Sequence, residues 1–472
     1  MKVNKEVDVL IVGAGISGID AAFRLQQRCP GKSFAILESR ARIGGTWDLF
    51  RFPGVRSDSD MYTLGFPFRP WRGPQAIVGG EAIRQYVEDT AREFGIFDKI
   101  RFNTHVATAR WSSADARWTV ETDHGAFSCR FLYLASGYYD YAAGHQPEWP
   151  GEADFKGHIV HPQFWPEDLD YSGKRVAVIG SGATAVTLVP AMADQAASVT
   201  MVQRSPSYIV AAPARDSMAK WLPAALIRWK HILMTISMFG RARRAPQRVA
   251  EWIRDKAREA LPAGYPVERD FSPRYDPWDQ RLCLIPDGDL FASISGGKAA
   301  IATGEIERFV PQGLRLKSGE TIRADVVVTA TGLNMRLLGG IELEVDGEAV
   351  RPAEHFIYKG MMLSGVPNLF VAFGYTNASW TLRADLTARS VCRLLNLMDR
   401  KGFTTSIAHQ PANLERRSIM ELSSGYVERA AETLPGQGDR QPWRVPQHYV
   451  KDLAAMTFGR IDEGLEFGPT AS

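Results

Sequence analysis

The stretch VDVLIVGAGISG, residues 7–18, predicts how the first part of this chain folds. Its apolar run stops at a glycine, which is typical of a buried strand in a parallel sheet. In the motif that follows, Gly13 permits a tight turn, Gly15 lets the backbone approach a pyrophosphate, and Gly18 allows a helix to pack closely on the strand. We therefore expect a helix over residues 16–28 whose positive amino-terminal end faces a phosphate.

A carboxylate follows at the place where such a unit binds a ribose. A second apolar run, residues 33–37, predicts a neighbouring strand and ends at Glu38, twenty positions after Gly18. A carboxylate at this spacing accepts hydrogen bonds from the hydroxyls of an adenosine ribose. Strand, motif, helix, strand and carboxylate in register indicate a dinucleotide-binding unit. The unit suits FAD, because a carboxylate would repel the 2′-phosphate of NADPH.

The same pattern recurs further along the chain. An apolar strand at residues 175–179 leads into GSGATA, residues 180–185, in which alanine takes the place of the third glycine. The strand expected at residues 198–202 is followed by a glutamine and then by Arg204, which we equate with Glu38 of the first unit. Because an arginine can bind a 2′-phosphate as a fork, this unit is predicted to bind NADPH. A solvated surface arginine is the alternative.

Weaker signals predict the elements around these units. The runs 101–109, 117–122 and 126–134 alternate in polarity and favour a small antiparallel meander inserted in the first domain. Further on, a helix is expected to end near residue 399. Its amino-terminal cap should come from Thr376, Asn377 or Ser379.

Two longer patterns lie beside the glycine motifs. FKGHIVHPQFWP, residues 155–166, fits the pattern F-x-G-x-x-x-H-x-x-x-W-P through Phe155, Gly157, His161 and Trp165. GGTWDLFRFPGVRSD, residues 44–58, fits [AG]-G-x-W-x4-[FY]-P-[GM]-x3-D and is too rich in glycine, proline and arginine for a regular element. The alternatives are a surface linker with a hydrogen-bonded histidine and an irregular surface turn.

With these patterns and an ATG at residues 330–332 in order, nearly the whole chain resembles the class B flavin-dependent monooxygenases of the Baeyer–Villiger type. PWDQRLCL (277–284) and GYTNASWTLRADL (374–386) are similar to the subgroup that activates the thioamide prodrug ethionamide. The resemblance implies an α/β fold with two Rossmann-like dinucleotide-binding domains, for FAD and NADPH, and a helical insertion. It implies an FAD domain at 1–145 and 345–472, a fingerprint linker at 146–173, an NADPH domain at 174–213 and 295–344, and a helical insertion at 214–294.

The resemblance also implies a reaction. NADPH would reduce the flavin, and molecular oxygen would then add at C4a to give a peroxyflavin that inserts one oxygen atom into ketones and oxidises sulfides or thioamides. Arg281 would stabilise the anionic peroxide, and Asp58 would position Arg281. Many members have a lysine before this arginine, where it helps to hold the 2′-phosphate. Here the residue is Gln280, which leaves more of the selectivity for NADPH to Arg204.

The residues expected to bind the two cofactors come from the glycine motifs, the loop at residues 44–58 and the ends of strands. They are Gly13, Gly15, Gly18, Glu38, Gly45, Thr46, Trp47, Asp58, Val106, Ser181, Gly182, Ala183, Thr184, Arg204, Ser205 and Thr331. No spacing of His, Cys, Asp or Glu indicates a metal site.

Composition excludes several other classes of protein. The net charge of +3 makes no strong case for nucleic acid. The four cysteines form no CxxC pair, which argues against a flavin disulfide reductase and for the reducing cytoplasm. We expect no signal peptide and no membrane span. A monooxygenase that oxidises only nitrogen or sulfur, an NADPH oxidase, and a nucleotide-binding module without turnover are the alternatives.

Residues 214–262 differ in character from the rest of the chain, because they look helical and are rich in basic and aromatic residues. One interpretation is a basic amphipathic helix that contacts a membrane peripherally. The other is a helical subdomain that lines a substrate tunnel, and the resemblance favours it.

Overall fold

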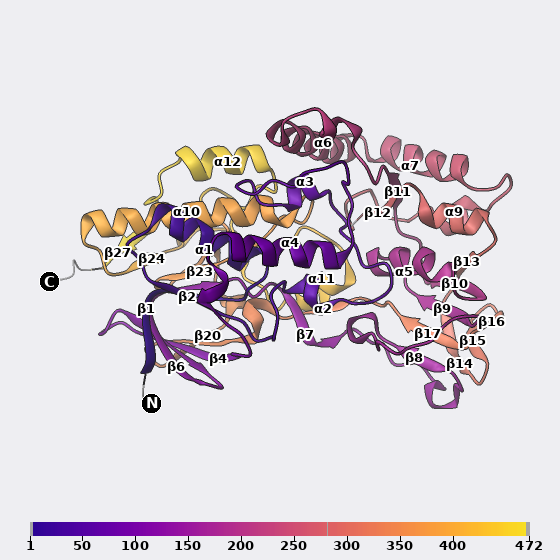
Figure 1. The fold of residues 1–472 in the computed structure, drawn as a ribbon, viewed down its shortest axis with the longest axis horizontal. Coiled ribbons are helices and arrows are strands. Elements are labelled where there is room, and N and C mark those ends of the chain that lie inside the picture. Colours follow the sequence, from indigo (N-terminus) through magenta and orange to yellow (C-terminus); the bar gives the residue numbers. More distant parts are fainter. Residues whose placement is uncertain (1–2, 281, 469–472) are drawn as a thin grey trace.

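A computed structural model describes residues 3–280 and 282–468 of the chain. Two sheets lie side by side along the length of the molecule, with helices over them (Figure 1). This arrangement confirms the α/β fold class expected from the sequence.

The larger sheet has nine strands and holds the first glycine motif. Its order is β20-β19-β4-β5-β6-β1-β2-β3, with β23 paired to β6. The bounds are β1 Val3–Val12, β2 Phe34–Leu37, β3 Ile100–Arg101, β4 Val106–Ser112, β5 Arg117–Thr122, β6 Gly125–Leu134, β19 Glu342–Val345, β20 Glu348–Val350 and β23 Leu369–Val371.

The expected antiparallel meander is only partly present. β4 and β5 pair antiparallel, and so do β5 and β6. However, β6 also pairs parallel with both β1 and β23, so it is a central strand of the main sheet. The last four residues of β6 are all buried, which a strand covered on both faces requires. The alternation of polar and apolar residues in the first half of β6 hid its central position in the sheet.

Three helices cover the parallel part of this sheet, namely α1 (Ile16–Arg28), α4 (Gly80–Glu93) and α10 (Trp380–Lys401). α1 packs against α10, and Arg24 on α1 forms a buried ion pair of 2.5 Å with Asp385 on α10. Ser379 precedes α10 as expected for a cap, but its side chain makes no capping hydrogen bond. Its hydroxyl instead lies 2.6 Å from that of Thr63, so it ties α10 to an earlier loop.

The smaller sheet is parallel throughout and holds the second glycine motif. Its order is β13-β10-β9-β17-β8. The bounds are β8 His158–Val160, β9 Arg175–Ile179, β10 Ser198–Gln203, β13 Ala299–Thr303 and β17 Val326–Thr329, with α5 (Ala183–Ala193) and α9 (Asp289–Ser295) packed beside them. The edge strand β8 comes from the expected linker, so part of the linker belongs to this sheet.

The chain crosses between the two sheets twice, through neighbouring strands. β7 (Tyr139–Gly144) leaves the larger sheet, and β18 (Leu333–Met335) returns to it. The two strands pair antiparallel, and β7 is seen passing between the two halves in Figure 1. The two covalent connections between the sheets therefore run side by side in one narrow two-stranded ribbon. The domain boundaries expected from the sequence stay a prediction.

A helical insertion follows β11 (Ile209–Ala212), which pairs parallel with β12 (Cys283–Pro286). It contains α6 (Ala224–Arg244), α7 (Pro246–Ala260) and α8 (Val267–Asp270), and α6 lies at the upper edge of the molecule in Figure 1. No helix in residues 3–280 and 282–468 combines the length and the apolar character that a bilayer crossing needs.

The remaining elements are short or belong to the C-terminal tail. The tail closes on itself through β24 with β27 and β25 with β26, while α12 packs on α10. The bounds are α2 Thr46–Leu49, α3 Met61–Leu64, α11 Gly425–Ala430, α12 Tyr449–Phe458, β14 Ile306–Val310, β15 Gly313–Leu316, β16 Thr321–Arg323, β21 Ile357–Tyr358, β22 Met362–Leu363, β24 Ser406–Ala408, β25 Arg417–Ser418, β26 Gly436–Gln437 and β27 Leu465–Phe467.

Candidate functional site

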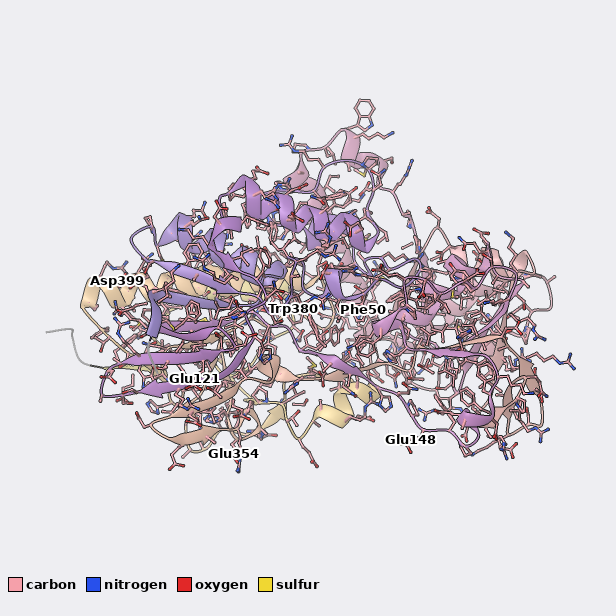
Figure 2. The ribbon with its side chains drawn as sticks, turned by 60° about the horizontal axis from the view of Figure 1, so that its bottom comes forward. Phe50, Glu121, Glu148, Glu354, Trp380 and Asp399 are labelled. Atoms are coloured by element: carbon pink, nitrogen blue, oxygen red, sulfur yellow. The ribbon has the colours of Figure 1, made fainter. Side chains whose placement is uncertain are left out.

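A cavity of about 1210 Å³ lies between the two sheets. It is lined by both glycine motifs and by residues just beyond the carboxyl ends of β1, β2, β9 and β10, which is where open parallel sheets bind ligands. Phe50 and Trp380, which also line it, lie between the two halves of the molecule in Figure 2. The cavity therefore opens onto both predicted nucleotide sites at once.

The first glycines of the two motifs are held in the same way. A β-carbon at Gly13 would come within 2.6 Å of the carbonyl oxygen of Ala135, and one at Gly180 within 2.3 Å of that of Ala330. Both glycines have positive φ, +104° and +136°, and both N–H groups donate hydrogen bonds of 2.8 Å to the end of the neighbouring strand. Because no side chain fits, the backbone itself faces the cavity at the start of α1 and α5.

Glu38 lies beside the first motif, as expected, and lines the cavity. Its Oε2 accepts a 2.7 Å hydrogen bond from the N–H of Ala14, and its Oε1 accepts one of 2.9 Å from the N–H of Arg40. Burial raises the pKa of Glu38, although these hydrogen bonds act in the opposite sense. A carboxylate fixed in this way can accept further hydrogen bonds from sugar hydroxyls.

The equation of Arg204 with Glu38 is wrong by one residue. Val12 pairs with Leu37 in the first unit, and Ile179 pairs with Val202 in the second, so the residue in the place of Glu38 is Gln203. Gln203 is buried, and its side-chain amide donates to Asp270 and Thr303. Arg204 is exposed and lines the cavity one residue further on.

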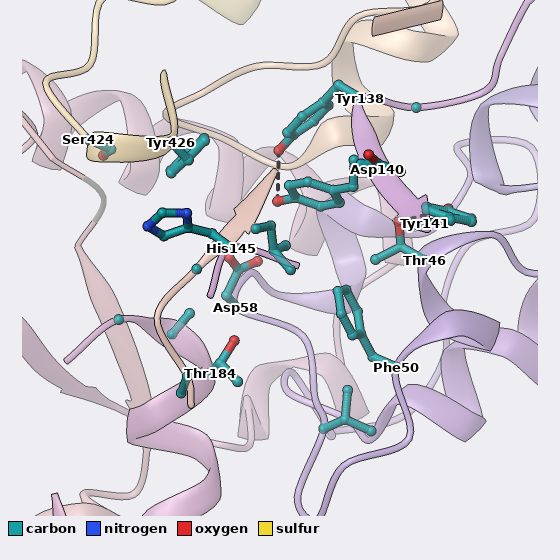
Figure 3. A pocket seen from close by; sticks show the side chains of 18 of the residues that line it. Thr46, Phe50, Asp58, Tyr138, Asp140, Tyr141, His145, Thr184, Ser424 and Tyr426 are labelled. Atoms are coloured by element: carbon teal, nitrogen blue, oxygen red, sulfur yellow. Dashed lines mark hydrogen bonds between the residues drawn. The ribbon is translucent and has the colours of Figure 1, made fainter. Parts of the chain in front are cut away.

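The loop at residues 44–58 borders the cavity on the side of the larger sheet. A β-carbon at Gly45 would lie 3.2 Å from the Cα of Gly15, so this loop and the first motif meet backbone to backbone. The hydroxyl of Thr46 lies 3.5 Å from that of Tyr141, and burial raises the pKa of Tyr141 to about 12. Figure 3 shows Asp58 facing the same space as Thr184, which comes from the second unit.

Most of the predicted cofactor residues line this cavity, but the linker residues do not. The lining residues among those predicted are Gly13, Gly15, Glu38, Gly45, Thr46, Trp47, Asp58, Val106, Ser181, Gly182, Ala183, Thr184, Arg204, Ser205 and Thr331. Gly18 lies beneath the turn, where a β-carbon would meet the carbonyl oxygen of Gly13 at 1.9 Å. Arg281 lies outside the described residues, while its neighbours Gln280 and Cys283 line the cavity.

The four linker residues Phe155, Gly157, His161 and Trp165 pack around the smaller sheet and the strand ribbon. Phe155 meets Phe309 edge to face at 5.8 Å, and a β-carbon at Gly157 would come within 2.2 Å of the carbonyl oxygen of Asp325. The ring of Trp165 packs against Tyr171. These contacts give the linker pattern a structural place outside the cavity.

His161 lies beside the end of β7, where this strand pairs with the start of β18. The N–H of Gln163 donates a 3.2 Å hydrogen bond to its Nδ1, and burial lowers the pKa of His161. Beside it, the N–H of His145 donates to the carbonyl oxygen of Gly332 at 3.1 Å. Thr331 closes the same junction, because its hydroxyl donates to the carbonyl oxygen of His145 at 2.5 Å.

The sequence did not single out a group of aromatic and basic residues that line the cavity. The hydroxyls of Tyr138 and Tyr139 lie 3.0 Å apart, and Trp380 donates a 2.8 Å hydrogen bond to Ser17 on α1. Figure 3 marks the hydrogen bond of the Tyr138 hydroxyl with a dashed line. Others in the group are Tyr141, His145, Arg336, Tyr426 and Arg429. A signal was available, since YYDY, residues 138–141, follows an ASG at residues 135–137 that mirrors the ATG at residues 330–332.

The cysteines do not form a redox pair at this site. Cys29 and Cys392 come together across α1 and α10, where the Cys29 thiol lies 3.7 Å from the carbonyl oxygen of Cys392. Both are buried free thiols outside the cavity lining, whereas Cys283 lines it without a cysteine neighbour among the described lining residues. A disulfide reductase needs two cysteines beside the flavin.

Comparison with known proteins places the chain among flavoproteins. The family model for pyridine nucleotide-disulphide oxidoreductases matches residues 10–225. The chain is 52% identical to the FAD-containing monooxygenase EthA of Mycobacterium tuberculosis, over 98% of both chains. It is 49% identical to EthA of Mycolicibacterium smegmatis, over 97% of this chain and 96% of that one.

Solved structures share the fold at lower identity. An oxidised steroid monooxygenase bound to NADP has a TM-score of 0.75 at 22% identity, covering 98% of this chain and 99% of that one. An open crystal structure of cyclohexanone monooxygenase has a TM-score of 0.76 at 21% identity, covering 99% and 100%. On the evidence of its sequence relatives and its fold, the chain belongs to the class B flavin-dependent monooxygenases, in the group of the FAD-containing monooxygenases named EthA.

Proposed function

We propose that the protein uses FAD, NADPH and molecular oxygen to insert one oxygen atom into ketones, giving esters or lactones, and to oxidise sulfides or thioamides. The observation that carries this proposal is the single cavity onto which both glycine motifs open. An enzyme that passes electrons from one dinucleotide to another needs both in one enclosed space. The flavin, once bound, would supply the oxygen-activating chemistry.

The larger sheet would hold FAD. The cradle consists of backbone at Gly13 and Gly15, with the amino-terminal end of α1 facing the pyrophosphate. Glu38 would accept the ribose hydroxyls, while Gly45, Thr46, Trp47 and Val106 would pack along the rest of the molecule.

The smaller sheet would hold NADPH. The turn from Ser181 to Thr184 would meet the pyrophosphate, and Arg204 with Ser205 would bind the 2′-phosphate at the rim. Thr331 would border the nicotinamide side. Gln203 would not repel the 2′-phosphate, because it is neutral where the first unit carries a carboxylate.

Arg281 and Asp58 would act on the reacting oxygen. Negative charge that develops in an enclosed cavity is stabilised by a fixed cation far more than it would be in water. We assign that cation to Arg281 and its positioning to Asp58, which lines the cavity. His161 and Trp165 would couple the two units and take no part in the chemistry.

A product screen with linear ketones, cyclic ketones and sulfides, under oxygen and NADPH, tests the proposal. Ester or lactone formation supports it. Sulfoxide as the sole product would assign the protein to the heteroatom-oxidising monooxygenases. NADPH consumption that yields only hydrogen peroxide would make it an oxidase. We also propose a cytoplasmic location, in line with four buried cysteines that form no disulfide with one another.

A further inference from the structure

Large apolar side chains are exposed on the outer face of α6 and on the turn that precedes it. Their exposed fractions are 86% for Trp221, 36% for Leu222, 55% for Leu226, 39% for Trp229 and 56% for Leu233. Trp221 and Leu222 lie in the turn before α6. Within the helix, Leu226, Trp229 and Leu233 are spaced three and four residues apart, which places these three side chains on one face. We call these five residues the apolar stripe.

The apolar stripe has no role in the site described above, because none of its residues lines the cavity. Single exposed apolar side chains are ordinary in soluble proteins, but a contiguous row is not. From Leu226 to Leu233 the row extends about 10 Å along the helix axis, and Trp221 and Leu222 continue it beyond the start of α6. An exposed apolar row of this size indicates a surface that binds another molecule or a membrane.

The charged residues around the apolar stripe indicate which kind of partner binds to it. Residues 217–250 contain no Asp and no Glu. The exposed cations Lys220, Arg241, Arg244 and Arg248 bracket the stripe at its two ends, and Arg244 falls on the same face of the helix as Leu233. An apolar row between cations, with tryptophan among its members, suits the headgroup region of an anionic bilayer.

We propose that the apolar stripe docks the protein on an anionic lipid surface. The apolar side chains would enter the boundary between headgroups and acyl chains, while the cations at either end would remain at the level of the lipid phosphates. A second copy of the chain is a weaker occupant. A symmetric interface would bring the cationic ends of two α6 helices against each other.

The inner face of α6 is fastened to the larger sheet's side of the molecule, so the stripe is presented on a fixed support. Arg228 donates hydrogen bonds of 2.7 Å to the carbonyl oxygens of Tyr62 and Gly65. His231 lies 2.8 Å from Asp216 and 3.5 Å from Asp60. Docking therefore costs little ordering of the helix, because α6 is already held in place.

Binding to lipid is measurable without turnover, so it stands apart from the proposed reaction. The FAD-loaded full-length protein is sedimented with sucrose-filled vesicles of phosphatidylcholine alone, or of phosphatidylcholine mixed with phosphatidylglycerol. We expect it to sediment with the mixed vesicles, to bind the neutral ones far more weakly, and to be released by salt.

Two pairs of substitutions separate the apolar contribution from the electrostatic one. Leu226→Ser with Leu233→Ser should weaken binding to the mixed vesicles about tenfold or more, because two buried apolar side chains are lost. Lys220→Gln with Arg244→Gln should remove most of the preference for the anionic lipid, at about fivefold for each cation.

The matched control is Phe458→Ser, which removes a side chain that is 84% exposed from the end of α12. It should bind vesicles like the parent, and all variants should keep their FAD and their NADPH oxidation. Equal binding to neutral and mixed vesicles would overturn the proposal, as would unchanged binding of the serine pair. If the parent ignores vesicles and is a dimer that the serine pair makes monomeric, the stripe is an interface between copies.

Discussion

The imidazole of His161 lies directly against the backbone of Gly144. A β-carbon added at Gly144 would come within 2.0 Å of Cε1 and 2.4 Å of Nε2 of that ring. Gly144 is the last residue of β7, and in the ribbon it pairs with Leu333 of β18. The histidine of the linker pattern is thus wedged into the crossing between the two sheets, and it sets how closely the linker and the ribbon approach.

Gly144→Ala should disturb the coupling of the two units while leaving FAD bound, because the new methyl group would force His161 away. We expect slower reduction of the flavin by NADPH and more NADPH consumed per product. His161→Ala should show the same effects more weakly. Stopped-flow reduction rates and the ratio of NADPH to product measure both.

The double variant is the control for this steric account. Gly144→Ala combined with His161→Ala removes the clash, so it should reduce its flavin faster than Gly144→Ala alone. If the effects of the two single substitutions on flavin reduction simply add, the contact between His161 and residue 144 is not the cause of the slower reduction. Parental rates in all three variants would reduce the linker pattern to a structural feature.

Arg204→Ala should weaken NADPH binding by about 1.5–3 kcal/mol, because a charge-assisted contact with the 2′-phosphate is lost. Use of NADH should change little. Dissociation constants of both nucleotides, measured on the oxidised protein, test this. Arg323→Ala, at an exposed position on β16, is the control and should alter neither value. An equal loss for both nucleotides would show that Arg204 serves the fold.

Arg281→Ala should fold and retain FAD but lose ester formation by about 10²–10³-fold, the usual loss when one preorganised charge is removed. Sulfide oxidation should suffer less, since it needs less stabilisation of negative charge. Asp58→Ala should show a milder form of the same defect. Product formation from a ketone and a sulfide, compared in each variant, is the measurement. Ketone turnover at the parental rate would refute the assignment.

The attachment of α6 should depend on pH. Burial alone would lower the pKa of His231, but hydrogen bonds and charge from Asp60 and Asp216 raise it above its ordinary value of 6.5. The stabilising effect of a raised pKa is fully present below pH 6.5 and is lost as the pH rises through the folded value. Lys230, which donates to Asp216 at 2.6 Å, and Tyr62, whose ring lies 4.9 Å from the imidazole, are the other groups that face the cluster.

His231→Gln should therefore lower the unfolding temperature at pH 6, by the equivalent of about 1.5–3 kcal/mol for a lost charged hydrogen bond, and should flatten the fall above that pH. Thermal unfolding of the FAD-loaded protein across this range is the test. His158→Gln, at an exposed position on β8 outside the cavity lining, should keep the parental profile. A slope that persists in His231→Gln would assign the pH dependence to other groups.

Local patterns predicted the parts of this molecule whose causes are local. The helix at residues 16–28 and the strand at residues 175–179 have the expected bounds, since glycine turns and apolar runs fix both ends. Nearly all the cofactor residues taken from the motifs reach one cavity, because parallel strands deliver their carboxyl ends to the same edge.

What the sequence missed depends on contacts between distant residues. The central place of β6 follows from its pairing with β1 and β23, and the alternation of polar and apolar residues in its first half hides that place from a local reading. Gln203 and Glu38 occupy equivalent positions in the two units. This equivalence becomes visible only when the registers of the two strand pairs are compared. Ser379 is a residue type that often caps helices, but its hydroxyl forms a hydrogen bond with the hydroxyl of Thr63 instead.

The strand ribbon has a consequence for how such a protein can change over evolution. His145 and Gly332 are joined by one hydrogen bond of 3.1 Å, and all five strands of the smaller sheet lie between them in the sequence. The whole segment from 146 to 331 thus enters and leaves the rest of the molecule at a single point. Adjacent ends of this kind are the arrangement that lets evolution insert a segment into an existing domain, or lengthen it there, without moving the rest of the chain.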